Sequence, residues 1–327
     1  MIYGSVCSGI EAATVAWHPL GWKPAFFSEI EPAPRSVLAH HYSDVPCHGD
    51  FTTIGANEYG PIDLLVGGTP CQSFSIAGLR GGLDDDRGNL ALEFIKLAQR
   101  TRPRWVVWEN VPGVLSSNRG RDFGTFLAAL GEIGYGFAYR VLDAQYFGVA
   151  QRRCRVFVVG CLGDWRRAAA VLFERHSLQG HSAPRREKGR AVAGKSKSTI
   201  DENSWPADVT STLNAAFGSK LGLEDQHIRS GAPLFVPDTV GTLTAKGPTA
   251  MGAPEVDAMH YIATTAVRRI TPRECERLQG FPDDYTLVQH RNKPMSDGPR
   301  YKALGNSMAV PVMRWIGERI AMVDALL

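Results

Sequence analysis

The sequence predicts an α/β fold, with a largely parallel sheet that carries helices on both faces. Short apolar runs alternate with helical patterns through the first 162 residues, which is the order expected of βαβ units. Helices cover such sheets because the crossover connections lie on their faces. The regular pattern stops near Cys161 and returns after Val267. Both ends of the chain are therefore expected to build one α/β domain around an irregular insert.

The expected elements follow the chain in order. Apolar runs predict strands at 2–6, 24–30, 62–68, 104–110, 137–144 and 155–162. Helical patterns are found at 9–20, 89–101, 122–133, 271–281 and 306–327. The helix at 89–101 has Leu90, Phe94 and Leu97 on one face. In the helix at 271–281, Thr271 is the expected N-cap and Glu274 completes a capping box.

The pattern divides the chain into three segments: an α/β segment at 1–162, an irregular region at 163–267 and a C-terminal segment at 268–327. The final helix at 306–327 is too apolar to be left in water, so we expect it to pack back on the first half. The irregular region is rich in Gly, Ser, Pro, Thr and Arg, and positions 166 to 197 hold nine Lys or Arg against two acids. Such a stretch is either a solvated loop or a segment that contacts phosphates.

Composition narrows the class of protein. The formal net charge of +3 does not by itself indicate nucleic acid. No leader and no apolar run long enough to cross a bilayer are found, so a soluble, cytoplasmic protein is expected. Its six cysteines are scattered without a C-x-x-C pair and are expected to be reduced. His40, His41, Cys47 and His48 lack the usual ligand spacing, so no metal site is expected.

Polar residues follow several of the predicted strands, at the edge where ligands bind in such sheets. The turn "YGSVCSGIEAA" places Gly9 between a strand and a helix, a geometry that lets the backbone approach a cofactor. Glu29 ends the second strand, where an acid can bind a ribose, and Asp50 is a possible adenine contact. Taken singly, each has an ordinary alternative: a common glycine turn, a solvent-facing glutamate and a loop acid.

Three later stretches can carry chemistry. Cys71 follows a strand in "GGTPCQSFSIAG", as a nucleophile or as a buried inert thiol. Glu109 ends the strand "WVVWEN", where desolvation would suit a proton donor, although it could equally cap or pair with a cation. Arg153 and Arg155 are two apart in a strand and so share a face, where they could hold an electron-rich base or remain solvated.

The order of these blocks carries more information than any one of them. The blocks are "CSGIEAA", "SEIE", "GDF", "GGTPCQSFSIAG", "DDRGNL", "ENVPGV", "QRRCR", "RRITPRECERLQGFPDDY" and "ALGNSMAVPV". In this order the chain resembles the DNA (cytosine-5)-methyltransferase family of bacterial and phage type, over nearly its whole length except the variable insert. Two departures occur in the first block: Cys7 stands where the family usually has an aromatic residue, and Glu11 and Ala12 stand where it has glycines.

The resemblance implies a Rossmann-like sheet and methyl transfer from S-adenosylmethionine to carbon 5 of cytosine in double-stranded DNA. Cys71 is then the nucleophile that adds to carbon 6. Glu109 holds and protonates ring nitrogen 3, and Arg155 with Arg153 supports the cytosine carbonyl oxygen and the glutamate. The target base is flipped out of the duplex. Residues 163–267 become a target-recognition region, and a monomer without metal is expected.

The resemblance also implies two sets of binding residues. The cofactor set consists of Ser8, Gly9, Ile10, Glu29, Ile30, Asp50, Phe51, Pro70, Leu90, Asn306 and Ser307. The DNA set consists of Gln72, Ser73 and Ser75 in the loop that closes over the base, with Thr242 and Leu243 in the insert. Two other functions stay open: a transfer RNA cytosine-5 methyltransferase, which keeps the same blocks, and a catalytically inactive DNA-binding regulator, against which Cys71, Glu109 and Arg155 argue.

Overall fold

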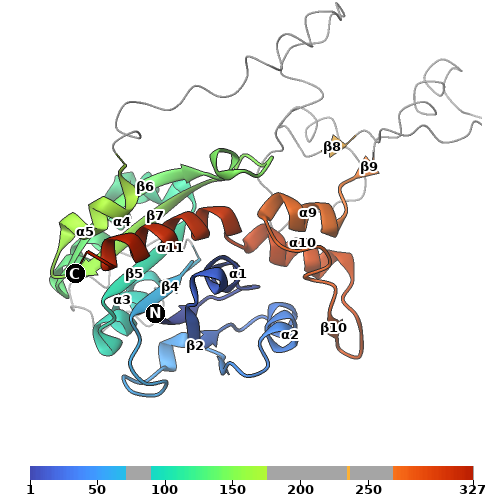
Figure 1. Cartoon of the computed structure of the whole chain (residues 1–327), viewed down its shortest axis with the longest axis horizontal. Helices are drawn as coiled ribbons and strands as arrows, with labels where there is room; N and C mark the ends of the chain where they lie inside the picture. The colour runs from blue at the N-terminus through green and yellow to red at the C-terminus, as the bar shows by residue number, and fades with distance from the viewer. Residues whose placement is uncertain (71–89, 175–233, 236–267, 327) are drawn as a thin grey trace, which may run out of the picture.

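The computed structural model describes residues 1–70, 90–174, 234–235 and 268–326. Its centre is a seven-stranded sheet in the order β3-β2-β1-β4-β5-β7-β6 (Figure 1). The strands are β1 Ile2–Val6, β2 Lys23–Ser28, β3 Cys47–His48, β4 Leu64–Gly67, β5 Trp105–Asn110, β6 Tyr135–Asp143 and β7 Cys154–Leu162. The five strands from β3 to β5 are parallel, whereas β7 runs antiparallel to both of its neighbours. The predicted α/β fold with a largely parallel sheet is confirmed.

Helices cover both faces of this sheet. They are α1 Ala12–Trp17, α2 Pro32–His41, α3 Leu90–Thr101, α4 Arg121–Glu132, α5 Trp165–Leu172, α9 Pro272–Gln279, α10 Asp297–Asn306 and α11 Val310–Asp324. Strand β5 shows why two cores form: Trp105 and Val107 point into one buried cluster, whereas Val106 and Trp108 point into the other. A strand with both faces buried is central, so its carboxyl end can be held rigidly. The remaining strands are short pairs, β8 Leu234–Phe235 with β9 Arg268–Arg269 and β10 Gln289–His290 with β11 Lys293–Pro294.

The expectation of irregular chain from residue 163 onward is wrong for α5. Asp164 caps this helix by accepting a hydrogen bond from the Arg166 amide at 2.8 Å. Ala168, Val171 and Leu172 are fully buried in the core, whereas Arg166 is exposed and Arg167 is partly buried. Apolar residues three and four apart were the available signal, but the neighbouring basic residues hid it. Helix α2, which begins at Pro32, was also not predicted.

The C-terminal segment packs against the start of the chain. Helix α11 lies beside α1, and Trp17 Nε1 donates a hydrogen bond to the Met313 carbonyl at 2.7 Å (Figure 1). The interface is close because Gly317 of α11 faces the Trp17 indole without a side chain. Among the described residues, no helix is long and apolar enough to span a membrane.

We expect Gly317→Ala to destabilise the protein. A Cβ at this position would collide with Trp17 Cδ1 and Nε1, and overpacking in a core typically costs about 1–3 kcal/mol. This loss offsets the gain of roughly 1 kcal/mol that alanine brings to a helix interior. Gly124→Ala in α4 is the matched control, because a Cβ there meets no atom within 4 Å and should stabilise. Urea unfolding of both variants checks this, and equal stabilisation by the two changes would contradict it.

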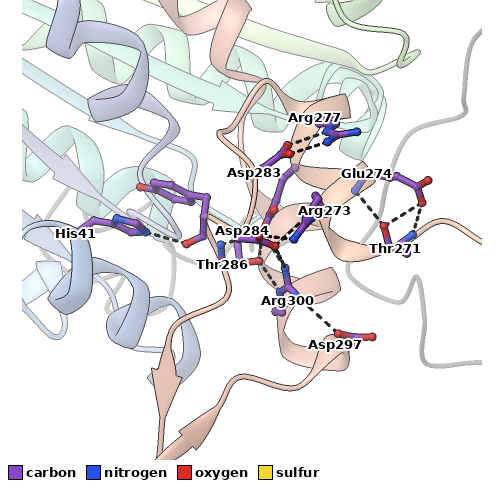
Figure 2. A network of polar contacts seen from close by, with 12 residues as sticks. His41, Thr271, Arg273, Glu274, Arg277, Asp283, Asp284, Thr286, Asp297 and Arg300 are labelled. Atoms are coloured by element: carbon purple, nitrogen blue, oxygen red, sulfur yellow. Dashed lines mark hydrogen bonds and ion pairs between the residues drawn. The ribbon is translucent and has the colours of Figure 1, made fainter.

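The capping box predicted at Thr271 is present at the start of α9, and two arginine–aspartate pairs lie further along the same helix (Figure 2). Arg277 Nε donates to Asp283 at 2.7 Å, and Arg273 Nε donates to Asp284 at 3.0 Å. These pairs tie α9 to the loop that follows it (Figure 2). The loop in turn reaches the first half of the chain through Tyr285, as described below.

Candidate active site

The carboxyl ends of β1, β4 and β5 meet at one cavity. The register of the sheet aligns the ends of these three strands, because Val6 pairs with Gly67 and Gly67 pairs with Trp108. The cavity is lined by Ser5, Val6, Cys7, Ser8, Gly9, Glu11, Ala12, Ala13, Val66, Gly68, Glu109, Asn306, Ser307 and Met308. The last three residues come from the C-terminal segment, so the far end of the chain completes a site that the first 110 residues begin.

The loop after β1 is held in a tight, left-handed path. Cys7, Gly9 and Glu11 have φ values of 49°, 56° and 61°. The Ser8 hydroxyl donates to the Ser5 carbonyl at 3.0 Å and accepts from the Ser28 amide at 3.0 Å. The loop is therefore fixed to the ends of both β1 and β2.

Glu29 joins this loop from β2. One carboxylate oxygen accepts a hydrogen bond from the Gly9 amide at 2.8 Å, and the other accepts from the Glu31 amide at 2.8 Å. The predicted cofactor residues Ser8, Gly9 and Glu29 are thus brought together. Each oxygen of Glu29 keeps a second lone pair for a ligand hydroxyl.

The other predicted cofactor residues lie in different surroundings. Ile30 follows Glu29 with 70% of its surface exposed, and a ring could pack on it. Asp50 accepts from the Thr52 amide at 3.0 Å and caps the short helix that follows β3. Phe51 is buried in the core that lies on one face of the sheet, so its side chain packs inside the protein. Ile10 is also fully buried, whereas Pro70 is exposed.

Glu109, at the end of β5, forms an ion pair with Arg155 of β7. The distance from Arg155 Nε to Glu109 Oε1 is 3.0 Å, and the two residues come from neighbouring antiparallel strands, in which Glu109 is paired with Phe157. Burial raises the pKa of the Glu109 carboxyl above its ordinary value, although Arg153 and Arg155 act in the opposite direction. A carboxyl of this kind keeps its proton to higher pH than an exposed glutamate.

Arg153 joins the C-terminal segment to β7. Its guanidinium donates to the carbonyl oxygens of Gly305 at 3.1 Å and Ser307 at 2.5 Å, and the residue is 2% exposed. Burial, with Arg155 nearby, lowers the pKa of Arg153 to about 9, while Glu109 acts to raise it. The two arginines therefore differ in what they touch: Arg155 pairs with the carboxylate, and Arg153 holds the backbone beside Asn306 and Ser307.

The segment that leads to Cys71 is fixed to the end of β5. Trp108 Nε1 donates to the Thr69 hydroxyl at 2.9 Å, and Asn110 Nδ2 donates to the Thr69 carbonyl at 3.1 Å. Gly68 lies so close to the carboxylate that a Cβ on it would be 3.0 Å from Glu109 Oε2. Sequence reasoning missed Thr69, although its place between two glycines and a proline before the cysteine was a signal.

Six predicted residues lie outside the described part of the chain: Cys71, Gln72, Ser73, Ser75, Thr242 and Leu243. Leu90 is the first residue of α3 and is partly buried. Among the described residues, no group of three or more His, Cys, Asp or Glu side chains is placed to hold a metal ion.

The five described cysteines are free thiols, and burial disfavours the thiolate form of each. They are Cys7, Cys47, Cys154, Cys161 and Cys275. Burial is the largest cause that raises the pKa of each of these thiols. Since the thiolate is the nucleophile, these side chains are poor nucleophiles at neutral pH.

Comparison with known proteins decides the family. The family model described as C-5 cytosine-specific DNA methylase matches residues 1–322, which is almost the whole chain. The chain belongs to this family. Its members are methyltransferases, so the family and the fold together imply the use of S-adenosylmethionine.

Relatives support the assignment. The type II methyltransferase M2.BsuMI of Bacillus subtilis (strain 168) is 30% identical, over 97% of this chain and 74% of that protein. A protein of Escherichia phage P1, named DNA N-6-adenine-methyltransferase, is 38% identical over 98% of this chain. This chain spans 61% of the phage protein's length.

Solved structures agree on the fold. The methyltransferase EhMeth of Entamoeba histolytica superposes with a TM-score of 0.64 at 14% identity, over 100% of this chain and 99% of that one. The crystal structure of the S. pombe Dnmt2 methyltransferase gives a TM-score of 0.64 at 16% identity, over 100% and 99%. This cytosine-5 methylase chain therefore has the fold of known methyltransferases.

Proposed function

We propose that this member of the cytosine-5 DNA methylase family methylates cytosine within a short duplex sequence, through a covalent adduct of Cys71. The observation that carries the proposal is that the chain after β4, which leads to Cys71, is bonded to the end of β5, which carries Glu109. The segment before Cys71 is bonded to Asn110 and Trp108, and Gly68 lies against the Glu109 carboxylate. The described chain that leads to Cys71 therefore lies beside the buried acid and its arginine partner.

Each residue has a distinct task in this reaction. The Cys71 thiolate forms a bond to carbon 6 of the flipped cytosine, and Glu109 gives its proton to ring nitrogen 3. The ring is then an enamine, whose carbon 5 is nucleophilic. Arg155 keeps the Glu109 carboxyl in place and neutralises the charge left after proton transfer. S-adenosylmethionine, when bound, supplies the methyl group as an electrophile to carbon 5.

The adduct must then be resolved. A base removes the proton from carbon 5, the electron pair re-forms the double bond between carbons 5 and 6, and the bond from carbon 6 to the Cys71 sulfur breaks. Nitrogen 3 returns its proton to Glu109, so the thiolate and the carboxyl are both restored.

The described residues fit S-adenosylmethionine. Gly9 brings backbone close to the cavity in a left-handed turn, and Glu29 offers carboxylate lone pairs suited to ribose hydroxyls. Ile30 adds exposed apolar surface beside them, on which an adenine could pack. Asn306 and Ser307 close the cavity from the C-terminal side, held there by Arg153.

Double-stranded DNA is the proposed partner, and a monomer is expected to act on one strand at a time. The sequence placed the first boundary at residue 162, and we now assign 1–172 to catalysis and cofactor binding, 173–267 to target recognition and 268–327 to completion of the catalytic domain. Helix α5 is part of the catalytic core, so recognition begins after Leu172. Thr242 and Leu243 remain candidates for DNA contact.

Analysis of the methylated product tests the proposal. Purified protein is incubated with labelled S-adenosylmethionine and unmethylated duplex DNA, and the product nucleosides are then separated. We expect 5-methylcytosine confined to one short sequence context, which bisulfite-type sequencing would identify. Formation of N6-methyladenine would instead support adenine-N6 methylation, the activity in the name of the phage P1 relative. Transfer only to transfer RNA, or to neither substrate, would favour the RNA enzyme or the inactive regulator.

A further inference from the structure

Glu11 is a buried acid in the wall of the site cavity. Its side chain accepts hydrogen bonds from the Thr14 amide at 3.3 Å, the Thr14 hydroxyl at 2.6 Å and the Ser5 hydroxyl. The residue is 1% exposed and lines the same cavity as Ser8 and Glu109. The carboxyl therefore lies just beneath the surface on which the cofactor is expected to bind.

The groups that face this carboxyl carry no positive charge. Besides the hydroxyls of Ser5, Ser8 and Thr14, they are the Cys47 thiol and the tyrosines Tyr3, Tyr42 and Tyr285, and no lysine or arginine is among them in the described part of the chain. Two other buried acids are paired with cations, Glu109 with Arg155 and Glu276 with Arg300, whereas the buried Glu29 is bonded to two backbone amides. A buried carboxylate without a counter-ion is costly, and burial accordingly raises the pKa of Glu11.

The backbone at Glu11 adds to this cost. Its φ of 61° and ψ of 58° lie in the left-handed region, which an ordinary side chain occupies at a penalty of about 1 kcal/mol or more. Glycine would adopt the same path without strain. Two unfavourable features at one cavity-lining residue point to a role that its hydrogen bonds alone do not explain.

We infer that Glu11 provides the negative charge that faces the sulfonium of S-adenosylmethionine and makes the site prefer this cation to the neutral thioether product. The inference rests on the proposed cofactor. The positive charge on sulfur is the one that disappears when the methyl group leaves, whereas the amino-acid ends of cofactor and product are identical. A buried charge near sulfur therefore distinguishes the two ligands, since charge interactions are strong where water is excluded.

Binding measurements test this without any turnover. Isothermal titration gives the dissociation constants of S-adenosylmethionine, S-adenosylhomocysteine and sinefungin, whose amine carries a charge near the position of the sulfonium. The variants are Glu11→Gln, which keeps size and polarity, and Glu11→Gly, which keeps the left-handed backbone. Asp122→Asn is the matched control: Asp122 is 2% exposed and accepts bonds from Ser117 and Asn118, and it does not line the cavity.

We expect both Glu11 variants to weaken the two cationic ligands by roughly tenfold while S-adenosylhomocysteine changes less than about twofold. The control should alter no affinity. An equal loss for all three ligands would overturn the inference, because it would give Glu11 a purely structural role, and so would unchanged affinities. Failure of the wild-type protein to bind any of them would instead refute the proposed cofactor.

A pH series adds an independent reading. The affinity ratio of cofactor to product should rise with pH in the wild type, because a cation binds better as the carboxyl ionises. Tyr3, Tyr42, Tyr285, Cys7 and Cys47 do not interfere near neutrality, since burial raises the pKa of each. Glu29, Asp50 and Glu109 are the other acids near the site. A rise of the affinity ratio with pH therefore supports the inference only if Glu11→Gln abolishes that rise. A rise that persists in this variant contradicts the inference.

Discussion

Cys71→Ser should reduce methyl transfer by roughly 10⁴-fold or more, because a serine hydroxyl is not ionised near neutral pH and cannot add to carbon 6. The five described thiols cannot replace it, since burial disfavours their thiolate forms. The change removes only the nucleophile, so binding of duplex DNA and of S-adenosylmethionine should persist. Single-turnover transfer of labelled methyl groups measures the loss.

A trapping experiment tests the covalent step itself. Duplex DNA with 5-fluorocytosine at the target position should form an adduct that survives denaturing electrophoresis, because fluorine cannot leave carbon 5 as a proton does. The wild-type chain should form it, and Cys71→Ser should not.

Cys47→Ser is the matched control for both assays. Cys47 is a partly buried thiol on the edge strand β3, and it does not line the cavity. This variant should keep transfer and trapping. An adduct in Cys71→Ser, or its loss in Cys47→Ser, would refute the assignment of the nucleophile.

Strand ends were the most predictable part of the site. Apolar runs fix where a buried strand stops, and parallel strands deliver the next residues to one edge of the sheet. Glu29 and Glu109 were found in this way, and they lie at the ends of β2 and β5. The spacing of Arg153 and Arg155 predicted a shared face, but it did not reveal that Arg153 would bond to the carbonyls at 305 and 307.

Tertiary contacts of this kind have no local pattern. The bond from Trp17 to Met313 joins residues 296 positions apart, and Tyr285 donates to the Ile10 carbonyl from 275 positions away. In the sequence, Glu11 was only a departure from the family's glycine pattern. The structure adds that its carboxyl is buried among uncharged groups. Helix α5 was missed because charged residues share its short sequence with the apolar face.

Glu109→Gln should lower kcat by about 10²–10⁴-fold, the usual contribution of a general acid. Glutamine can still hydrogen-bond to ring nitrogen 3, but it has no proton to give, so the negative charge that develops on the ring is not neutralised. Affinity for S-adenosylmethionine should change little. Because Arg155 loses its anionic partner, thermal unfolding must first show that the variant folds.

Asp122→Asn again supplies the control, as a neutralised buried acid outside the cavity that should keep kcat. A Glu109→Gln variant within tenfold of the wild type would contradict the role of proton donor. It would leave Glu109 as a residue that only positions Arg155.

The pH profile separates proton donation from positioning. The wild-type kcat/KM requires an ionised Cys71 and a protonated Glu109, so it should rise at low pH with the thiolate fraction. It should stop rising once pH passes the pKa of Glu109, which burial raises above its ordinary value. Glu109→Gln has no such proton to lose, so its residual kcat/KM should continue to rise until the thiol is ionised. Parallel profiles for the two proteins would mean that the proton reaches ring nitrogen 3 from another donor.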